Sequence, residues 1–396
     1  MYEVTELTQT LRRGNLEDAR QRLEQGEKLP ANLADFDKRQ ITDTLLRAKA
    51  FDLVDRLVKD RVVDLDVYEY DKLDGSIFES IFRNLGDTPE ELAFLESFLS
   101  RTDNINDAVA DITLLELAFT KNAPLAHIEL LVAAGCDLQR KDNYDHTYLY
   151  KVVRTYGIKT DKGLLYLDYL IRNGVDPNAG NVAGETPLHL VIGEQTKAYS
   201  TFLLEHGADL NQQNKKGESA FYTAIVHHVC TAELYKHLTQ YAAPDFEMIN
   251  NNGETIICGA IRMRSRGSES ETALIKALIA DGADIYQTSP WYSKGKAALD
   301  WVAEYPAEVL QAIMDTGAIE LERRDDQGNT LLHKVCAYNV NYQQEAAKQL
   351  YRKVKLLIEA GADVNVTNDQ DQTPFDLAAQ DNLKSKTVEL LLKHKS

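Results

Sequence analysis

The sequence predicts an all-α solenoid of about 10–11 helix–loop–helix units, joined by short β-turn or hairpin loops. Three observations predict this fold class. A glycine follows each of several apolar helical runs, a tight-turn motif comes soon after it, and a Ser or Thr then marks the next helix. Each unit is therefore expected to run through a turn, a short helix, a loop and a longer helix.

Glycine-containing segments end the longer helices and set the period. Gly174 and Gly207 lie 33 residues apart (207 − 174), and Gly317 and Gly361 lie 44 apart (361 − 317). A glycine just past a helix end adopts a left-handed turn without steric strain. The basal unit is thus 33 residues, with insertions of unequal length. The segments are GCDLQ at Gly135, GVDPN at Gly174, GADLN at Gly207, GADIY at Gly282, GAIEL at Gly317 and GADVN at Gly361, with a degenerate copy, YAAPDF, near Ala242.

A second motif places Asn or Asp three residues before a glycine, which is typical of a tight turn. It occurs at Asn181–Gly184, Asn214–Gly217, Asn250–Gly253 and Asp325–Gly328. Shortly after each glycine comes a residue suited to a helix start, because a hydroxyl caps free N–H groups and Pro fits the first helical position. The expected starts are Thr186-Pro187, Ser219-Ala220, Thr255-Ile256, Thr330-Leu331 and Thr373-Pro374.

These motifs together resemble the ankyrin repeat. The copies that carry the resemblance are GETPLHLVIGEQTKAYSTFLLEHGADLN at 184–211, GNTLLHKVCAYN with LLIEAGADVN within 328–365, and QTPFDLAA at 372–379. The resemblance implies better-defined repeats over 108–396 with a C-terminal cap. Residues 1–107 are expected to form degenerate repeats, including an N-terminal cap, of the same continuous solenoid, with 30–70 departing most from the pattern.

The chain is acidic, since 62 Asp and Glu against 44 Lys and Arg give a formal charge of −18. Nucleic acids and anionic membranes require dense Lys and Arg, so neither is expected as a partner. The charge suits a basic protein partner, or it serves only to keep a long array soluble. No stretch approaches the roughly 18 apolar residues that span a bilayer. We expect a monomer when the protein is free.

The cysteines and the N-terminal segment predict a cytoplasmic protein. Glu3 and Glu6, without an apolar run, are unlike a secretory signal. The four cysteines are far apart and form no CxxC pair, which favours a reducing compartment. They are Cys136, Cys230, Cys258 and Cys336.

No sequence pattern predicts catalysis, a cofactor or a metal site. GxSxG, HExxH, GxGxxG and GxxxxGK are all missing from the sequence. His189 and His333 occupy the fourth position of TPLH-like turns, where the ankyrin resemblance implies a structural hydrogen-bonding role. The segment His227-His228-Val229-Cys230 is the best metal candidate, but adjacent helical side chains point about 100° apart. We therefore expect one exposed histidine, one partly buried histidine and an apolar cysteine in this segment, rather than a metal site. Because no catalytic motif occurs, we do not expect the protein to be an enzyme.

Three irregular segments interrupt the repeats. The basic stretch Arg262–Gly267, within 262–272, is interpreted as a mobile loop between two helices, with docking to an acidic surface as the alternative. Insertions at 155–166 and 338–353 lengthen helix-to-helix connections, and each is expected either to make a secondary contact or to extend a helix.

The ankyrin resemblance implies a partner-binding surface on the turn tips and the exposed side of the first helices. Aromatic side chains there serve either as interface anchors or as packing under irregular loops. Carried over by alignment, the expected partner-binding residues are Tyr144, His146, Arg154, Val182, Glu185, Glu194, Lys216, Glu218, His227, Asn252, Glu254, Arg262, Trp291, Tyr292, Lys294, Lys296, Tyr305, Gln327, Asn329 and Tyr338.

The function expected is that of a non-catalytic scaffold for protein–protein interaction. The divergent repeats and acidic charge look like stand-alone ankyrin proteins of bacteria, some of which are immunity proteins that neutralise a cognate toxin. The alternatives are an ankyrin-type effector or adaptor that recruits a host or cellular protein, and an enzyme with an unrecognised site.

Overall fold

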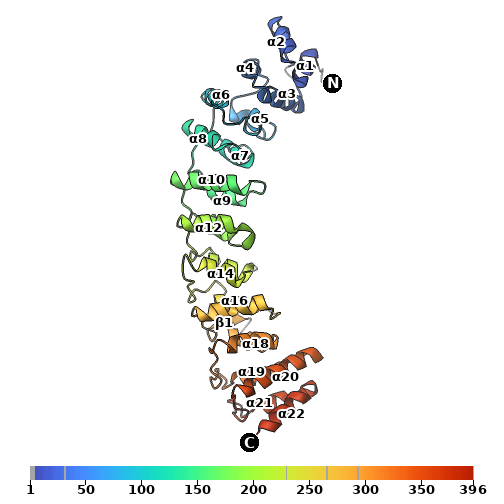
Figure 1. Cartoon of the computed structure of the whole chain (residues 1–396), viewed down its shortest axis with the longest axis vertical. Helices are drawn as coiled ribbons and strands as arrows, with labels where there is room; N and C mark the ends of the chain where they lie inside the picture. The colour runs from blue at the N-terminus through green and yellow to red at the C-terminus, as the bar shows by residue number, and fades with distance from the viewer. Residues whose placement is uncertain (1–4, 31–32, 229, 265, 292–293, 396) are drawn as a thin grey trace. The chain divides into compact units, whose positions relative to one another are not determined.

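A computed structural model describes residues 5–30, 33–228, 230–264, 266–291 and 294–395, of which Trp291 and Lys294 are described by their backbone alone. The chain forms two compact units, residues 1–182 and 183–396. Both are built from successive pairs of helices (Figure 1). Among the described residues, α1 to α22 fall into eleven such pairs, which agrees with the repeat number expected from the sequence.

The N-terminal unit contains the first five pairs. Odd-numbered helices pack in series, α1 on α3, α3 on α5, α5 on α7 and α7 on α9. The segment expected to depart most from the pattern also contains a regular pair, α3 with α4, followed by a short 3-10 turn at Val67–Glu69. The helices are α1 Glu6–Arg13, α2 Leu16–Glu24, α3 Asp35–Arg47, α4 Phe51–Lys59, α5 Ile77–Asn84, α6 Pro89–Leu99, α7 Leu114–Thr120, α8 Leu125–Ala133, α9 Tyr148–Arg154 and α10 Thr160–Arg172.

The C-terminal unit contains the other six pairs, and in it α15, α17, α19 and α21 pack in series, as do α14, α16, α18, α20 and α22. A π-helical turn, η3 Thr223–His227, continues α13. Short 3-10 turns at Glu194–Thr196 and Asn382–Lys384 precede α12 and α22. The helices are α11 Pro187–Val191, α12 Lys197–Glu205, α13 Ala220–Tyr222, α14 Ala232–Leu238, α15 Ile256–Met263, α16 Glu269–Ala280, α17 Ala298–Val302, α18 Ala307–Met314, α19 Leu331–Ala337, α20 Gln344–Glu359, α21 Pro374–Ala378 and α22 Ser385–His394.

Each turn is held by its own Asx side chain and by the next turn. The Oδ1 atom of Asn214 accepts the N–H groups of Lys216 and Glu218 at 2.8 and 3.1 Å. Gly217 has φ +74°, and a Cβ there would approach Asn250 Cα to 3.0 Å, so both backbone angle and space require glycine. The Asn251 N–H then donates to Lys216 O at 2.8 Å. Successive turn tips are therefore bonded to one another and held in place.

The short first helices begin at the predicted residues. Ser219 Oγ accepts the Tyr222 N–H at 3.1 Å, and Thr255 Oγ1 accepts the Cys258 N–H at 3.3 Å. Thr186, Thr330 and Thr373 occupy the same position before α11, α19 and α21. The apolar positions of both helices then face the neighbouring repeats, since Leu188 and Leu203 are fully buried. Burying such a side chain contributes about 1.5–3 kcal/mol, so stability accumulates from repeat to repeat.

Polar groups from one repeat satisfy the free carbonyls at the end of a first helix in another repeat. Lys353 Nζ donates to the carbonyls of Val302, Ala303 and Tyr305 at and just after the end of α17. Lys384 Nζ donates to Cys336 O near the end of α19, at 2.9 Å. Cations favour the negative end of a helix dipole. These bonds connect one repeat to another in addition to the apolar contacts.

Arg264 makes the same kind of contact. This contact contradicts the interpretation of the basic stretch Arg262–Gly267 as a mobile loop at this residue. Its side chain is buried, at 6% exposure, and donates to Ala260 O at 3.1 Å and to Ile225 O at 2.5 Å. Arg262 belongs to α15. The stretch is thus not a mobile loop at these two residues, because a guanidinium is buried here only where carbonyls accept its protons. Ser265 lies outside the described residues.

The two insertions are partly helical. The insertions at 155–166 and 338–353 extend the second helix of their repeats, so that α10 has 13 residues and α20 has 16. A two-stranded antiparallel hairpin, β1 Thr288–Trp291 with β2 Lys294–Ala297, replaces the tight turn before α17 (Figure 1). In the described part of the chain, no helix has the length and apolar character that a membrane crossing requires.

Candidate functional site

One turn tip of the N-terminal unit is held by a single carboxylate. Asp142 Oδ1 accepts the N–H groups of Tyr144 and His146, both at 2.9 Å, and Oδ2 lies 3.0 Å from His146 Nδ1 and 3.2 Å from Lys151 Nζ. Burial alone would raise the pKa of Asp142, but these hydrogen bonds and the Lys151 charge lower it to about 2. Asp142 therefore remains ionised and keeps the tip rigid.

This tip presents an exposed aromatic ring. Tyr144 is 62% exposed and lies 5.7 Å from the His146 ring, which in turn stacks on Tyr150 at 4.4 Å. Val182, which is 44% exposed, donates its N–H to Tyr144 O at 2.9 Å. Two apolar side chains thus project from adjacent tips on a fixed backbone, an arrangement suited to an interface anchor. His146 is 8% exposed and supports the tip from below, so it does not present its ring to solvent.

The C-terminal unit contains a hollow of about 260 Å³ between two turn tips and the first helices behind them. Acidic, basic and apolar side chains all contribute to its wall. The hollow is lined by Glu185, His189, Leu190, Asn214, Lys216, Glu218, Thr223 and His227. Four of the residues expected to bind a partner, namely Glu185, Lys216, Glu218 and His227, therefore lie together. Leu190 of α11 also lines this hollow and is half-buried.

Charged pairs cross the first helices of three consecutive repeats in this unit. Each joins the residue after a turn to a residue at the end of the following first helix. Glu218 Oε1 lies 3.2 Å from His227 Nε2, Glu254 binds Arg262, and Lys296 binds Glu304. The turn residue is acidic in the first two pairs and basic in the third, so the order of the charges is reversed once along the unit.

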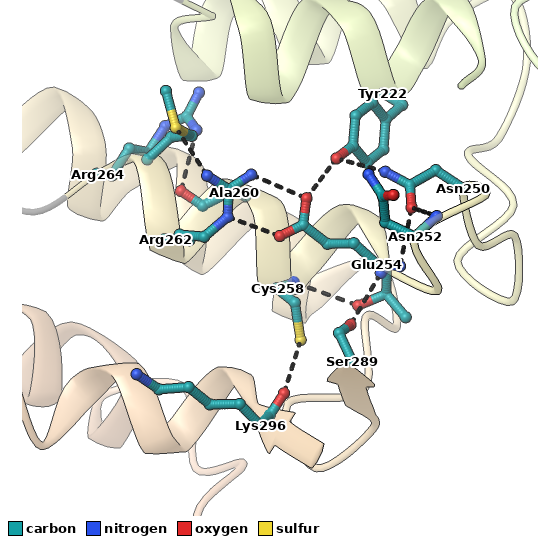
Figure 2. Close-up of polar contacts among 12 residues, drawn as sticks. Tyr222, Asn250, Asn252, Glu254, Cys258, Ala260, Arg262, Arg264, Ser289 and Lys296 are labelled. Atoms are coloured by element: carbon teal, nitrogen blue, oxygen red, sulfur yellow. Dashed lines mark hydrogen bonds and ion pairs between the residues drawn. The ribbon is translucent and has the colours of Figure 1, made fainter. Parts of the chain in front are cut away.

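The Glu254 pair is the most completely bonded of the three (Figure 2). Its carboxylate receives Arg262 Nε at 2.7 Å and Nη2 at 2.9 Å, and it accepts the Tyr222 hydroxyl proton. Burial would raise the pKa of Glu254, but the bonds from Arg262 and Tyr222 hold it below the ordinary value. Bidentate pairs of this kind are the strongest ion pairs in proteins. Asn250 Nδ2 also donates to Tyr222 Oη, at 3.0 Å.

The other residues expected to bind a partner are distributed over both units. Arg154, Glu194, Asn252 and Gln327 are exposed, and Asn329 is half-buried, accepting from Asn368 Nδ2 at 2.9 Å. Tyr305 and Tyr338 are half-buried, and Tyr305 donates its hydroxyl proton to Arg262 O at 2.7 Å. This contact is typical of a side chain packed within the protein rather than of an exposed interface anchor. Tyr292 and the side chains of Trp291 and Lys294 lie outside the described residues.

The histidines of the TPLH-like turns are structural, as expected. His189 Nδ1 accepts the Thr186 N–H at 3.2 Å, and Nε2 donates to Glu218 O at 3.1 Å. His333 makes the same contacts, with Thr330 N–H at 3.2 Å and Gln372 O at 3.1 Å. Burial lowers the pKa of both imidazoles, which keeps Nδ1 free to accept.

The histidine–cysteine segment differs from expectation in the exposure of one histidine. His227 and His228 are both exposed, where one was expected to be partly buried, while Cys230 is buried. Among the described residues, no three His, Cys, Asp or Glu side chains come together as metal ligands. Burial raises the pKa of the Cys230 thiol to about 12, so it stays protonated and unreactive.

Three residues of the Tyr144 tip were not predicted from the sequence. Asp142 fixes the tip, Lys151 pairs with it, and Asp145 occupies the position of the turn glycine with φ +60°. Asp is among the few residues that tolerate this angle. The spacing of Asp142 and Asp145 repeats the Asx–glycine spacing of the other turns, and this is the signal that would have located the tip.

Comparison with known proteins gives one family and several similar structures. The ankyrin repeat family model matches residues 183–215 and 327–369. No curated protein sequence matches the chain. The ankyrin repeat domain of Bcl-3 is 21% identical, with a TM-score of 0.47, over 62% of this chain and 99% of that one. The human ASB11 ankyrin repeat domain is 19% identical, with a TM-score of 0.44, over 63% of this chain and 99% of that one.

A third similar structure is described as the predatory endopeptidase Bd0816 from Bdellovibrio bacteriovorus in complex with the immunity protein Bd3460. It is 20% identical, with a TM-score of 0.40, over 52% of this chain and 97% of the matched chain.

The family match coincides with the geometry of the turns. The segment 183–215 includes the Thr186–His189 cap, and 327–369 includes the equivalent Thr330–His333 cap. Both caps are followed by a second helix and a glycine with positive φ, at Gly207 and Gly361. By its repeat motif, its helix pairs and this family match, the chain contains ankyrin repeats, matched at 183–215 and 327–369.

Proposed function

We propose that this protein binds another protein through its turn tips and the exposed faces of its first helices, without catalysing a reaction. Ankyrin repeats are modules for protein–protein interaction, and a stack of repeats presents an extended binding surface. The observation that carries the proposal is the Tyr144 tip. An aromatic ring that is 62% exposed is held there on a backbone fixed by Asp142, so little conformational entropy is lost when a partner covers it.

We further propose that the partner is basic and that it is a toxin which this protein neutralises. The support is electrostatic, because a formal charge of −18 attracts a positively charged protein over distances of about 10 Å. Such steering raises association rates by about 10–10³-fold, and fast capture is what neutralisation of a toxin requires.

Site-specific photocrosslinking in the native cell tests the proposal. The photoreactive residue p-benzoylphenylalanine is placed at Tyr144, or at Leu165 of α10 as the matched control, since Leu165 is 53% exposed on a second helix. The proposal expects a crosslinked protein at position 144 that position 165 does not yield. Equal crosslinking at both positions, or none at 144 while 165 reacts, would contradict it.

The identity of the crosslinked protein tests the finer proposal. A basic protein whose toxicity is lost on co-expression with this chain supports toxin neutralisation. An acidic or non-toxic partner contradicts that role while leaving protein binding in place.

A further inference from the structure

We propose that the hollow of the C-terminal unit binds an arginine or lysine side chain of the partner, with the Glu218 carboxylate as its counter-ion. This inference rests on the proposed function, because it specifies what one part of the binding surface recognises. The inference is based on a comparison between neighbouring repeats of the same unit, in which Glu218 and Glu254 pair with different basic side chains.

Glu218 and Glu254 occupy equivalent positions, each directly after the turn glycine of its repeat. Glu254 binds a guanidinium from the end of its first helix, with both Arg262 bonds shorter than 3.0 Å. At the end of its own first helix, one residue further along and within the π-helical turn η3, His227 faces Glu218 at 3.2 Å. An imidazole nitrogen makes one contact to a carboxylate, whereas a guanidinium donates two N–H groups in a fixed fork, so His227 is a weaker partner than an arginine. The repeat that contains Glu218 therefore has the carboxylate of a Glu254–Arg262-like pair, but it lacks the guanidinium.

The Glu218 backbone is fixed at the wall of the hollow, and its carboxylate is largely buried there. The Glu218 N–H donates to Asn214 Oδ1 at 3.1 Å, and the Glu218 carbonyl accepts from His189 Nε2 at 3.1 Å. Its side chain is 12% exposed, whereas that of His227 is 46% exposed. A carboxylate held in this way has lost much of its hydration, so a cation with good geometry is bound more strongly than at an open surface.

The remaining lining suits a long basic side chain. Leu190 offers an apolar wall for its methylene groups, and Glu185 is a second carboxylate on the opposite tip. Lys216 also lines the hollow, but it is exposed, so solvent and salt screen its charge. The volume of about 260 Å³ leaves room for one such side chain beside His227. The Arg262–Glu254 pair shows the bidentate geometry that an incoming guanidinium would adopt.

Binding of a single capped amino acid tests this directly. N-acetyl-arginine-N-methylamide is titrated into the full chain with 13C-labelled histidine, and the imidazole signals of His227 are followed by NMR. The same titration with the neutral citrulline analogue is the control. We expect a saturable shift of the His227 signals with arginine and none with citrulline. An equal response to both compounds, or no response to arginine, would overturn the proposal.

Three variants separate charge at the hollow from overall charge. Glu218→Gln is expected to weaken arginine binding by about tenfold or more. Glu205→Gln, which removes the same charge from an exposed position in α12, should leave it unchanged. His227→Arg supplies the missing guanidinium within the chain, as Arg262 does for Glu254, so it should also abolish binding of the probe, now detected through the labelled His189. Unchanged binding in folded His227→Arg contradicts the proposal even if Glu218→Gln fails to fold.

The result of the arginine titration and the result of the crosslinking experiment at Tyr144 are independent of each other. If a partner crosslinks at Tyr144 while arginine does not bind the hollow, the proposed function stands and this inference fails. If arginine binds the hollow but no partner is captured at Tyr144, the hollow is confirmed as a cation site while the proposed function fails.

Discussion

Replacing Lys353 with Met tests how the repeats are held together. Lys353 lies on α20 and is 1% exposed, and its ammonium group donates to the carbonyls of Val302, Ala303 and Tyr305. Methionine has a similar length and keeps the apolar contacts, but it donates no proton. Lys353→Met therefore leaves three carbonyls near the end of α17 without this donor.

The change in the free energy of unfolding caused by Lys353→Met is the difference between two opposing effects. A buried acceptor that loses its partner costs about 1–3 kcal/mol, and two of the three bonds lie fully in the interior, giving about 2–6 kcal/mol. Against this, burial lowers the pKa of Lys353 from 10.5 to about 8, and this difference of 2.5 corresponds to about 3.4 kcal/mol of unfavourable desolvation that Met avoids. The difference of these two terms runs from a gain of about 1.4 kcal/mol to a loss of about 2.6 kcal/mol, so Lys353→Met should change the free energy of unfolding by less than about 3 kcal/mol at pH 7.

The effect of Lys353→Met should grow with pH. Because the folded-state pKa is lower than the unfolded one, the penalty for burying the charged amine is fully present below pH 8 and is lifted as the pH rises towards 10.5. The wild-type protein therefore gains up to about 2 kcal/mol from this group between pH 8 and 9.5, and the variant does not. The neutral amine still donates two protons, so the native bonds persist.

Urea unfolding at pH 7, 8 and 9.5 provides the assay, combined with hydrogen exchange of the amides in α17, α19 and α20. Exchange is needed because repeat arrays open in segments. The expected result is a destabilisation that is local to these helices and larger at pH 9.5 than at pH 7. A variant as stable as the wild type at pH 9.5, or a difference that does not change with pH, would refute the reasoning.

Three further predictions follow from the same structure. Tyr342 is 96% exposed and has φ +61°, so Tyr342→Gly should stabilise the protein by about 1 kcal/mol in thermal unfolding, and a loss of stability would show that the ring has a packing role. Burial lowers the pKa of His189 and His333, so the free energy of unfolding should fall as the pH drops from 6.5 to 5, and the double His→Gln variant should show a flatter dependence in urea titrations; an unchanged slope would contradict this. Tyr144→Ala should change stability by less than about 0.5 kcal/mol but weaken capture of the crosslinked partner by at least about tenfold, and undiminished capture would exclude Tyr144 as an anchor.

The sequence predicts the repeats wherever local chemistry determines structure. Asn214, Gly217 and Ser219 each act within a few residues of the chain, through a turn, a positive φ and a cap, so their spacing alone locates a repeat. Asp145 and Asp371 take the place of the turn glycine, with φ angles of +60° and +57°. A pattern based on glycine alone therefore does not identify these turns. The physical requirement is the backbone angle rather than the residue type.

Contacts between repeats are what sequence reasoning could not supply. Lys353 and Arg264 look like surface residues, and they are buried because carbonyls of other repeats accept their protons. The pairing of Glu254 with Arg262 and Tyr222 likewise depends on how successive repeats stack (Figure 2). The candidate surface was therefore predicted as a set of positions, while the hollow and its charge balance required the structure.

The most direct test of the central claim is a hydroxyl-radical footprint of the chain with and without its captured partner. If the protein binds through its turn tips, modification of residues 142–146, 214–218 and 250–254 should fall on complex formation. The second helices α10, α12 and α14 should react as before. Protection confined to those second helices, with the tips unchanged, would contradict the account.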